Sequence, residues 1–119
     1  MKLIVLDESP AEGGVFRKLA DLCGSAQIKA DSLEWFPTPA DLFASFLPGA
    51  NSLVFIRLGG AVNGLKAAQE LKSMDRSVRL VFFSSSGRYA LESYEFQPVD
   101  YLLEPVDTGR LGAVLIRAG

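Results

Sequence analysis

The sequence predicts an α/β fold in which a parallel sheet of five strands is covered by helices on both faces. Five short apolar runs alternate with amphipathic, helix-like segments along the chain. Each run is apolar at successive positions, a pattern typical of strands that are buried on both faces of a sheet. With 119 residues, of which 49% are hydrophobic, the chain is expected to form one domain over residues 1–119.

The predicted strands are apolar runs that stop at polar or turn-forming residues, over residues 3–6, 33–36, 52–56, 78–83 and 101–103. The first helix is expected to begin at Ser9, Pro10 and Glu12, which supply a capping hydroxyl, a proline at the first helical position and an acidic residue three positions after the cap. It is expected to reach about Leu22 and to end at Gly24.

The later helices have comparable start signals. Thr38 and Pro39 repeat the cap-and-proline start, and a third helix opens at Asn63 or Gly64. Its apolar face is predicted to hold Ala67, Leu71 and Met74. A fourth helix is predicted over residues 87–96 and a fifth over 108–117. This last helix ends near the final residue, which suggests the N-terminal module of a longer protein.

Composition excludes several classes of function. The net charge is −2 without a block of basic residues, so binding of nucleic acid or a membrane through bulk charge is not expected. No apolar run is long enough to span a membrane and no signal peptide is recognisable, which favours a cytoplasmic protein. The chain lacks histidine, which removes histidine-based acid–base chemistry, and Cys23 is interpreted as a packed thiol.

Polar residues follow the predicted strands at their carboxyl ends, where open parallel sheets form their binding sites. These candidate site residues are Asp7, Glu8, Arg57, Ser84 and Glu104. Each of these residues, taken alone, could also be an ordinary solvent-exposed polar residue at the end of a strand. Because five of them are expected at one edge of the sheet, we take them together as the candidate site.

The layout resembles the receiver domain of two-component response regulators over nearly the whole chain. The matching segments are IVLDESP, LVFIRLGGAVNGLKAAQELK, LVFFSSSGRYALESYEF and VDYLLEPVD. The resemblance implies a flavodoxin-like, doubly wound sheet with strand order 2-1-3-4-5. It matches the acidic pair to Asp7 and Glu8, the conserved hydroxyl to Ser84 and the switch aromatic to Tyr101. The YALE helix is common in receivers attached to LytTR-class DNA-binding domains.

Two positions depart from the receiver pattern. Arg57 stands where the family has the aspartate that accepts a phosphoryl group, and Glu104 stands where it has a lysine. A guanidinium has no free lone pair and stays charged, so Arg57 cannot be the acceptor. It also competes with Mg²⁺ for the surrounding carboxylates, so we expect weak metal binding or none. We further expect no other cofactor and no enzymatic activity.

The exchanged charges suggest an internal ion pair. We expect Arg57 to pair with Glu104, with Asp7 or with both, in place of the contacts that phosphate and metal make in the family. The alternative is that Arg57 points to solvent and Glu104 is unpaired.

The predicted function is a phosphorylation-independent interaction module of two-component-type signalling. The resemblance implies a protein partner or a homodimer through the fourth helix, fifth strand and fifth helix. Residues expected on that face are Arg88, Tyr89, Glu92, Tyr94, Glu95, Tyr101 and Arg110. Two alternatives stay open: a phosphorelay receiver that uses Asp7 or Ser84 as its acceptor, and a flavodoxin-like binder of a small ligand. The second lacks a glycine-rich phosphate cradle.

Overall fold

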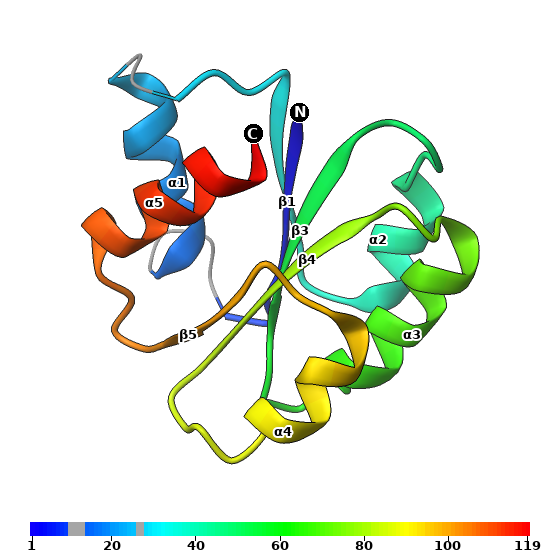
Figure 1. Cartoon of the computed structure of the whole chain (residues 1–119). Helices are drawn as coiled ribbons and strands as arrows, with labels where there is room; N and C mark the ends of the chain where they lie inside the picture. Colours follow the sequence, from blue (N-terminus) through cyan, green and yellow to red (C-terminus); the bar gives the residue numbers. More distant parts are fainter. Residues whose placement is uncertain (10–13, 26–27) are drawn as a thin grey trace.

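The computed structural model describes residues 1–9, 14–25 and 28–119. Its five strands are parallel and form one sheet in the order β2-β1-β3-β4-β5, which confirms the predicted flavodoxin-like fold (Figure 1). The strands are β1 (Lys2–Leu6), β2 (Ser32–Phe36), β3 (Ser52–Arg57), β4 (Arg79–Ser84) and β5 (Asp100–Leu103).

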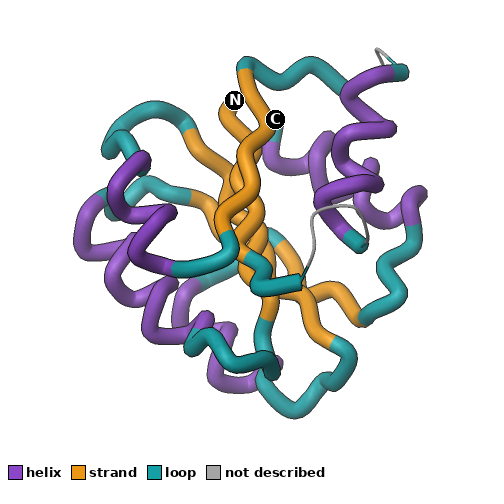
Figure 2. Tube along the Cα trace, turned by 180° about the vertical axis from the view of Figure 1, so that it is seen from behind, coloured by secondary structure: helices purple, strands orange, loops and turns teal. Residues whose placement is uncertain are grey.

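The helices cover both faces of the sheet. They are α1 (Val15–Gly24), α2 (Pro39–Ser45), α3 (Gly64–Met74), α4 (Ala90–Ser93), the 3₁₀-helix η1 (Tyr94–Phe96) and α5 (Thr108–Ala118). Helices α1 and α5 lie on one face, and α2, α3 and α4 lie on the other, as Figures 1 and 2 show from opposite sides. The sheet therefore separates two apolar cores.

Alternation along the central strands supplies both cores. In β3, Leu53 and Phe55 pack with α1 and α5, whereas Val54 and Ile56 pack with α2 and α3. All four side chains are fully buried, which explains the uninterrupted apolar run in the sequence. The edge strand β2 is only partly buried along its length.

Polar caps fix the starts of three helices. Thr38 Oγ1 accepts a hydrogen bond from the Asp41 amide at 3.2 Å, and Asn63 Oδ1 accepts one from the Lys66 amide at 3.1 Å. Helix α3 thus begins at Gly64 after an asparagine cap, as predicted. Asp107 caps α5 in the same way.

The first helix differs from its prediction. Its expected start at Pro10 to Glu12 lies outside the described residues, and the described helix begins at Val15 after Gly14, which has a φ of 75°. Gly24, expected to end the helix, is its last residue.

Helix α4 is much shorter than predicted. It begins at Ala90 instead of Gly87, and its last turn is the 3₁₀-helix η1. The Ser86 hydroxyl accepts a hydrogen bond from the Arg88 amide at 3.1 Å, so a local turn occupies the residues expected to form the first helical turn. Of the three residues predicted to share the apolar face of α3, Ala67 and Leu71 are buried, whereas Met74, the last residue of the helix, is 39% exposed.

Among the described residues, the helices are too short and too polar for any of them to cross a membrane.

Candidate functional site

The candidate site lies at the edge of the sheet where the parallel strands end. The register aligns Leu6 with Ile56 and Ile56 with Phe82, so β1, β3 and β4 end within two residues of one another along the sheet. The residues predicted from the sequence lie at or just after the ends of these strands and of β5: Asp7, Glu8, Arg57, Ser84 and Glu104.

Arg57 lies between two carboxylates. Its Nε donates to Glu104 Oε1 at 3.0 Å, and its Nη1 lies 3.5 Å from Glu8 Oε1. The three side chains are 23%, 25% and 28% exposed for Arg57, Glu104 and Glu8, so the charges are largely withdrawn from water. The predicted pairing with Glu104 is confirmed, and the alternative in which Arg57 points to solvent is wrong.

The expected pairing with Asp7 is not found. Across residues 1–9, 14–25 and 28–119, Glu8 and Glu104 are the acidic partners of Arg57. Asp7 is buried and is held toward β2: its amide donates to the Phe36 carbonyl, and its carbonyl accepts from the Trp35 indole at 2.9 Å. Its Oδ1 accepts from the Ser9 amide. These bonds leave Glu8 as the acidic residue after β1 that reaches Arg57.

Glu8 also fastens the loop between β3 and α3. Its Oε2 accepts a hydrogen bond from the Val62 amide at 3.0 Å. A Cβ placed on Gly60 would overlap with Glu8 Oε1, so a side chain there would displace the carboxylate. Gly60 is therefore a site residue that sequence reasoning missed. The only signal was the unusual Gly59-Gly60 pair after Arg57.

Ser84 is buried beside this loop. Its hydroxyl accepts from the Ser86 amide at 3.3 Å, and its carbonyl accepts from the Glu104 amide. A Cβ on Gly59, whose φ is 95°, would lie 3.3 Å from Ser84 Oγ and 3.2 Å from the Tyr89 ring. The loop backbone and Tyr89 thus pack closely around Ser84. A cavity of about 230 Å³ is lined by Tyr89 and residues 58–65 of this loop, and Arg57 does not line it.

The switch aromatic predicted for the interaction face is buried. Tyr101 is 8% exposed, and its hydroxyl donates to the Ser86 carbonyl at 2.6 Å. Its ring therefore does not contribute to the surface, although it ties β5 to the loop after β4.

The other residues predicted for that face are partly or fully accessible: Arg88, Tyr89, Glu92, Tyr94, Glu95 and Arg110. Arg88 stacks over the Tyr89 ring at 5.3 Å, and Arg110 pairs with Asp100. Sequence reasoning missed Leu91, which is 83% exposed on the first turn of α4. The helix predicted over residues 87–96 gave no indication of which of its apolar residues are exposed and which are buried.

Cys23 belongs to the core and not to the site. It packs on the core beneath α1, and burial raises the pKa of its thiol. A raised pKa lowers the thiolate fraction, which agrees with the interpretation of a packed thiol.

No family model matches the sequence. The chain is 22% identical over 112 residues to the sensory transduction protein LytR of Staphylococcus epidermidis, and 25% identical over 114 residues to the sensory transduction protein LytT of Bacillus cereus. Each alignment covers 93% of this chain, but only 43% of LytR and 44% of LytT. The chain thus spans less than half the length of the curated relatives it matches.

The structure is also similar to the response regulatory domain of protein mrkE from Klebsiella pneumoniae. The TM-score is 0.73 at 18% identity, and the match covers 99% of this chain and 94% of that domain. The chain has the receiver-domain fold of response regulators. Within this receiver fold, Arg57 and Glu104 occupy the ends of β3 and β5, where the resemblance places the acceptor aspartate and the lysine.

The residues at this edge of the receiver fold do not fit the Mg²⁺ ion that the resemblance implies. Mg²⁺ is held by carboxylate, phosphate and water oxygens in octahedral geometry. Arg57 places a fixed positive charge 3.0 Å from Glu104 Oε1 and 3.5 Å from Glu8 Oε1, while Asp7 Oδ1 accepts from a backbone amide. Two of the three carboxylates, Glu8 and Glu104, are therefore already paired with a cation of the protein itself.

Proposed function

We propose that the chain is a degenerate receiver domain of two-component-type signalling, which acts as a protein-interaction module without phosphorylation at position 57. The receiver fold and the similarity to two sensory transduction proteins support the signalling role. The observation that carries the proposal is the Arg57 guanidinium between Glu8 and Glu104. The proposed module is not an enzyme and binds Mg²⁺ weakly or not at all.

The chemistry of Arg57 supports independence from phosphate. A phosphoryl acceptor needs a nucleophilic oxygen, and a guanidinium offers only N–H donors. The contacts of Arg57 also join three segments, since Glu8 follows β1, Arg57 ends β3 and Glu104 follows β5. This internal cation links the loops in one arrangement without a covalent modification.

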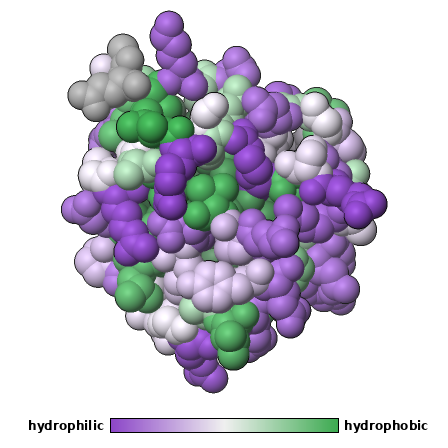
Figure 3. All heavy atoms as spheres, viewed as in Figure 1, coloured by the Kyte–Doolittle hydropathy of each residue, from purple (hydrophilic) through white to green (hydrophobic). Residues whose placement is uncertain are grey.

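The proposed contact surface is the face formed by α4, β5 and α5. Leu91 and Tyr94 are 83% and 62% exposed, and Leu103 at the end of β5 is also exposed. Figure 3 shows separate apolar patches among hydrophilic side chains on the side where Figure 1 shows these elements. Exposed aliphatic and aromatic groups beside the Asp100–Arg110 ion pair suit a protein partner or a second copy of the chain.

The chemical part of the proposal is tested by incubating the chain with acetyl phosphate and Mg²⁺ and measuring its intact mass. The expected result is no covalent gain. Beryllofluoride is likewise expected to leave the fluorescence of Trp35 unchanged, and Trp35 is a suitable reporter because its indole donates to the Asp7 carbonyl. A phosphoryl group located on Asp7 or Ser84 would overturn the proposal in favour of a phosphorelay receiver.

The interaction part is tested on the same face. Leu91→Asp should weaken binding to a partner or to a second copy, because it places a charge on the exposed apolar surface. Leu47→Asp is the matched control, since Leu47 is also exposed but lies after α2. Equal effects of the two variants would contradict a role for the α4–β5–α5 face.

A further inference from the structure

A hollow lies between α3 and the short α4–η1 segment. It consists of one cavity of about 490 Å³ and a second of about 270 Å³, which share Glu95 and Phe96 in their lining. Phe96 is partly buried and packs toward Phe82 in the core, with ring centroids 6.1 Å apart. We call this surface the α3–α4 hollow. Its charged residues from α4 and η1 are Glu92 and Glu95, whereas the exposed Leu91 and Tyr94 are not among its lining residues.

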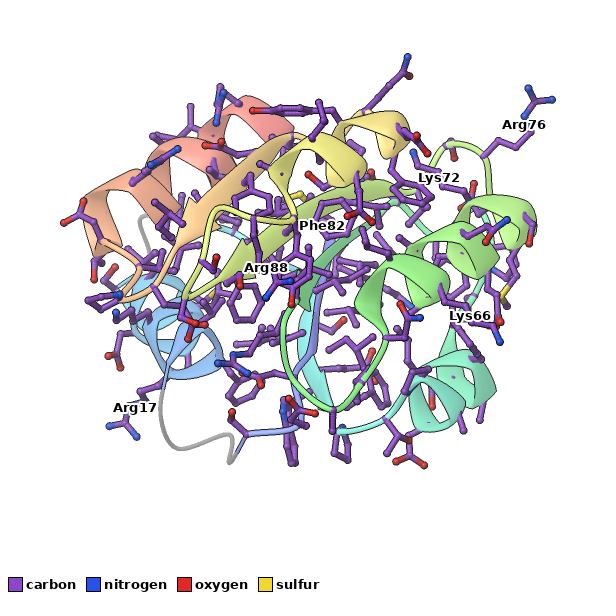
Figure 4. All side chains as sticks on the ribbon, turned by 90° about the horizontal axis from the view of Figure 1, so that it is seen from below. Arg17, Lys66, Lys72, Arg76, Phe82 and Arg88 are labelled. Atoms are coloured by element: carbon purple, nitrogen blue, oxygen red, sulfur yellow. The ribbon has the colours of Figure 1, made fainter. Side chains whose placement is uncertain are left out.

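One wall of the α3–α4 hollow is basic. Lys66 near the start of α3 and Arg76 just after its end both line the hollow and are exposed. Figure 4 shows both side chains on the α3 side of the molecule, with Lys72 beside them. Lys72 is already engaged, because its ammonium donates to the Val78 carbonyl at 2.7 Å, and burial lowers its pKa against the opposing effect of Asp75. The accessible cations of this wall are thus Lys66 and Arg76.

The opposite wall is acidic. Glu92 and Glu95 are exposed and line the same hollow. In the part of the chain that the structure describes, no ion pair joins Lys66 or Arg76 to either glutamate. Lys66 and Arg76, the basic row, thus line one wall of the hollow, and Glu92 and Glu95, the acidic row, line the other without forming ion pairs with them.

We propose that the α3–α4 hollow is a self-association surface that takes a second copy of the chain. In a two-fold dimer the same patch is used by both copies. A two-fold axis that runs parallel to the two rows places Lys66 and Arg76 of each copy opposite Glu92 and Glu95 of its partner. An axis across the rows would place like charges together, so the charge pattern selects the first arrangement.

The presence of both positive and negative charges in the hollow also favours a second copy of the chain over other partners. A nucleic acid or a uniformly acidic protein would be attracted by the basic row and repelled by the acidic row of the same hollow. A second copy satisfies both rows at once, and it brings the two partly exposed Phe96 rings to the centre of the contact. This inference goes beyond the proposed function, because it adds α3 as a contact element and assigns Glu92 and Glu95, which were predicted for the α4–β5–α5 face, to the acidic wall of the hollow.

The test is a charge exchange followed by sedimentation. Lys66→Glu with Arg76→Glu makes both rows acidic, and Glu92→Lys with Glu95→Lys makes both rows basic. The self-association constant of each variant alone should fall by roughly tenfold or more, because attraction becomes repulsion between the facing rows. An equimolar mixture should regain a dimer, since each row then meets its opposite on the partner. Added salt should weaken both the wild-type dimer and the mixed dimer.

The matched control is Arg17→Glu with Lys29→Glu, two exposed residues outside this surface whose exchange changes net charge equally. Figure 4 shows Arg17 on the far side of the molecule from Lys66 and Arg76. This control variant is expected to self-associate as the wild-type chain does. It is not expected to form a dimer with the variant that carries Glu92→Lys and Glu95→Lys. Circular dichroism of every variant checks that it is folded.

Three outcomes would overturn the inference. They are a wild-type chain that stays monomeric at every concentration and salt, a mixture that does not recover a dimer, and association that Leu91→Asp removes while the Lys66 and Arg76 variant keeps it. The last result would assign association to the α4–β5–α5 face and so support the proposed function. The two surfaces can therefore fail independently.

Discussion

At the scale of single residues, the decisive feature is one guanidinium placed among carboxylates. Arg57, Glu8 and Glu104 are each about three-quarters buried, so their attraction is screened less than that of a surface pair. Their desolvation cost is offset only while the charges remain together. The structure therefore predicts energetic coupling between these side chains.

We expect Arg57→Ala and Glu104→Ala each to lower the free energy of unfolding by about 1–3 kcal/mol, because each leaves a partly buried charge without its nearest partner. The double variant should lose less than the sum of the two, with an interaction of at least about 0.5 kcal/mol. Chemical denaturation of the four proteins measures this cycle. The exposed pair of Arg17 and Asp21 serves as the comparison, for which near-additive losses are expected. Additive losses at Arg57 and Glu104 would mean that the contact is not energetically coupled.

The sequence predicted this contact only in part. The pairing of Arg57 with Glu104 was predictable because Arg57 ends β3 and Glu104 directly follows β5, and the ends of parallel strands meet at one edge. Which of Asp7 and Glu8 contacts Arg57 could not be predicted from the sequence. It depends on three hydrogen bonds that turn Asp7 toward Ser9 and β2, and these follow from the path of the chain after β1.

At the scale of elements, the loop between β3 and α3 is fastened to the end of β1 through Glu8. One oxygen of Glu8, Oε2, accepts a hydrogen bond from the Val62 amide, and the other, Oε1, contacts the Arg57 guanidinium. Gly60 leaves the space for this carboxylate. The conformation of the loop and the ion pair at the site thus depend on one another.

Gly60→Ala should therefore lower the free energy of unfolding by roughly 1–3 kcal/mol, because its Cβ would displace Glu8 from a backbone amide and from Arg57. The effect is steric, since Gly60 does not have the positive φ found at Gly59. Thermal and denaturant unfolding measure the change. Gly112→Ala is the control within α5: a Cβ there meets no atom within 4 Å, so a gain of about 0.5–1 kcal/mol is expected from helix propensity. A neutral Gly60→Ala would show that Glu8 does not hold the loop.

Strands and helices were predictable to different degrees. Uninterrupted apolar runs located β1, β3 and β4, because strands buried on both faces need apolar residues at every position. The length of α4 was not predictable from periodicity. The Ser86 hydroxyl forms a local turn before it, and Gln97 with a φ of 50° ends η1, so both ends are set by backbone geometry.

At the scale of the whole molecule, the receiver fold holds an ion-paired Arg57 with Glu8 and Glu104 at one edge of its sheet. Both cores on the two faces of the sheet are filled by aliphatic and aromatic side chains, and neither core includes the residues at positions 57 and 104. The fold can therefore tolerate other charges at this edge. This separation between scaffold and site permits a direct test of what Arg57 excludes.

The whole-molecule prediction concerns the response of stability to Mg²⁺. An ion that binds only the folded state raises the free energy of unfolding by roughly 1.4 kcal/mol at ten times its Kd, which raises the Tm of a chain of this size by about 4 °C or more. We expect no such rise for the wild-type chain, because Arg57 already occupies the carboxylates.

The double exchange Arg57→Asp with Glu104→Lys should create the response to Mg²⁺, because it adds a carboxylate at β3 and frees Glu8 from its cation. Differential scanning calorimetry with and without Mg²⁺ measures it. Arg17→Asp adds an exposed carboxylate near Asp21 and controls for weak surface binding. If the wild-type chain gained as much stability from Mg²⁺ as the exchanged variant, Arg57 would not be the group that keeps a metal from this edge.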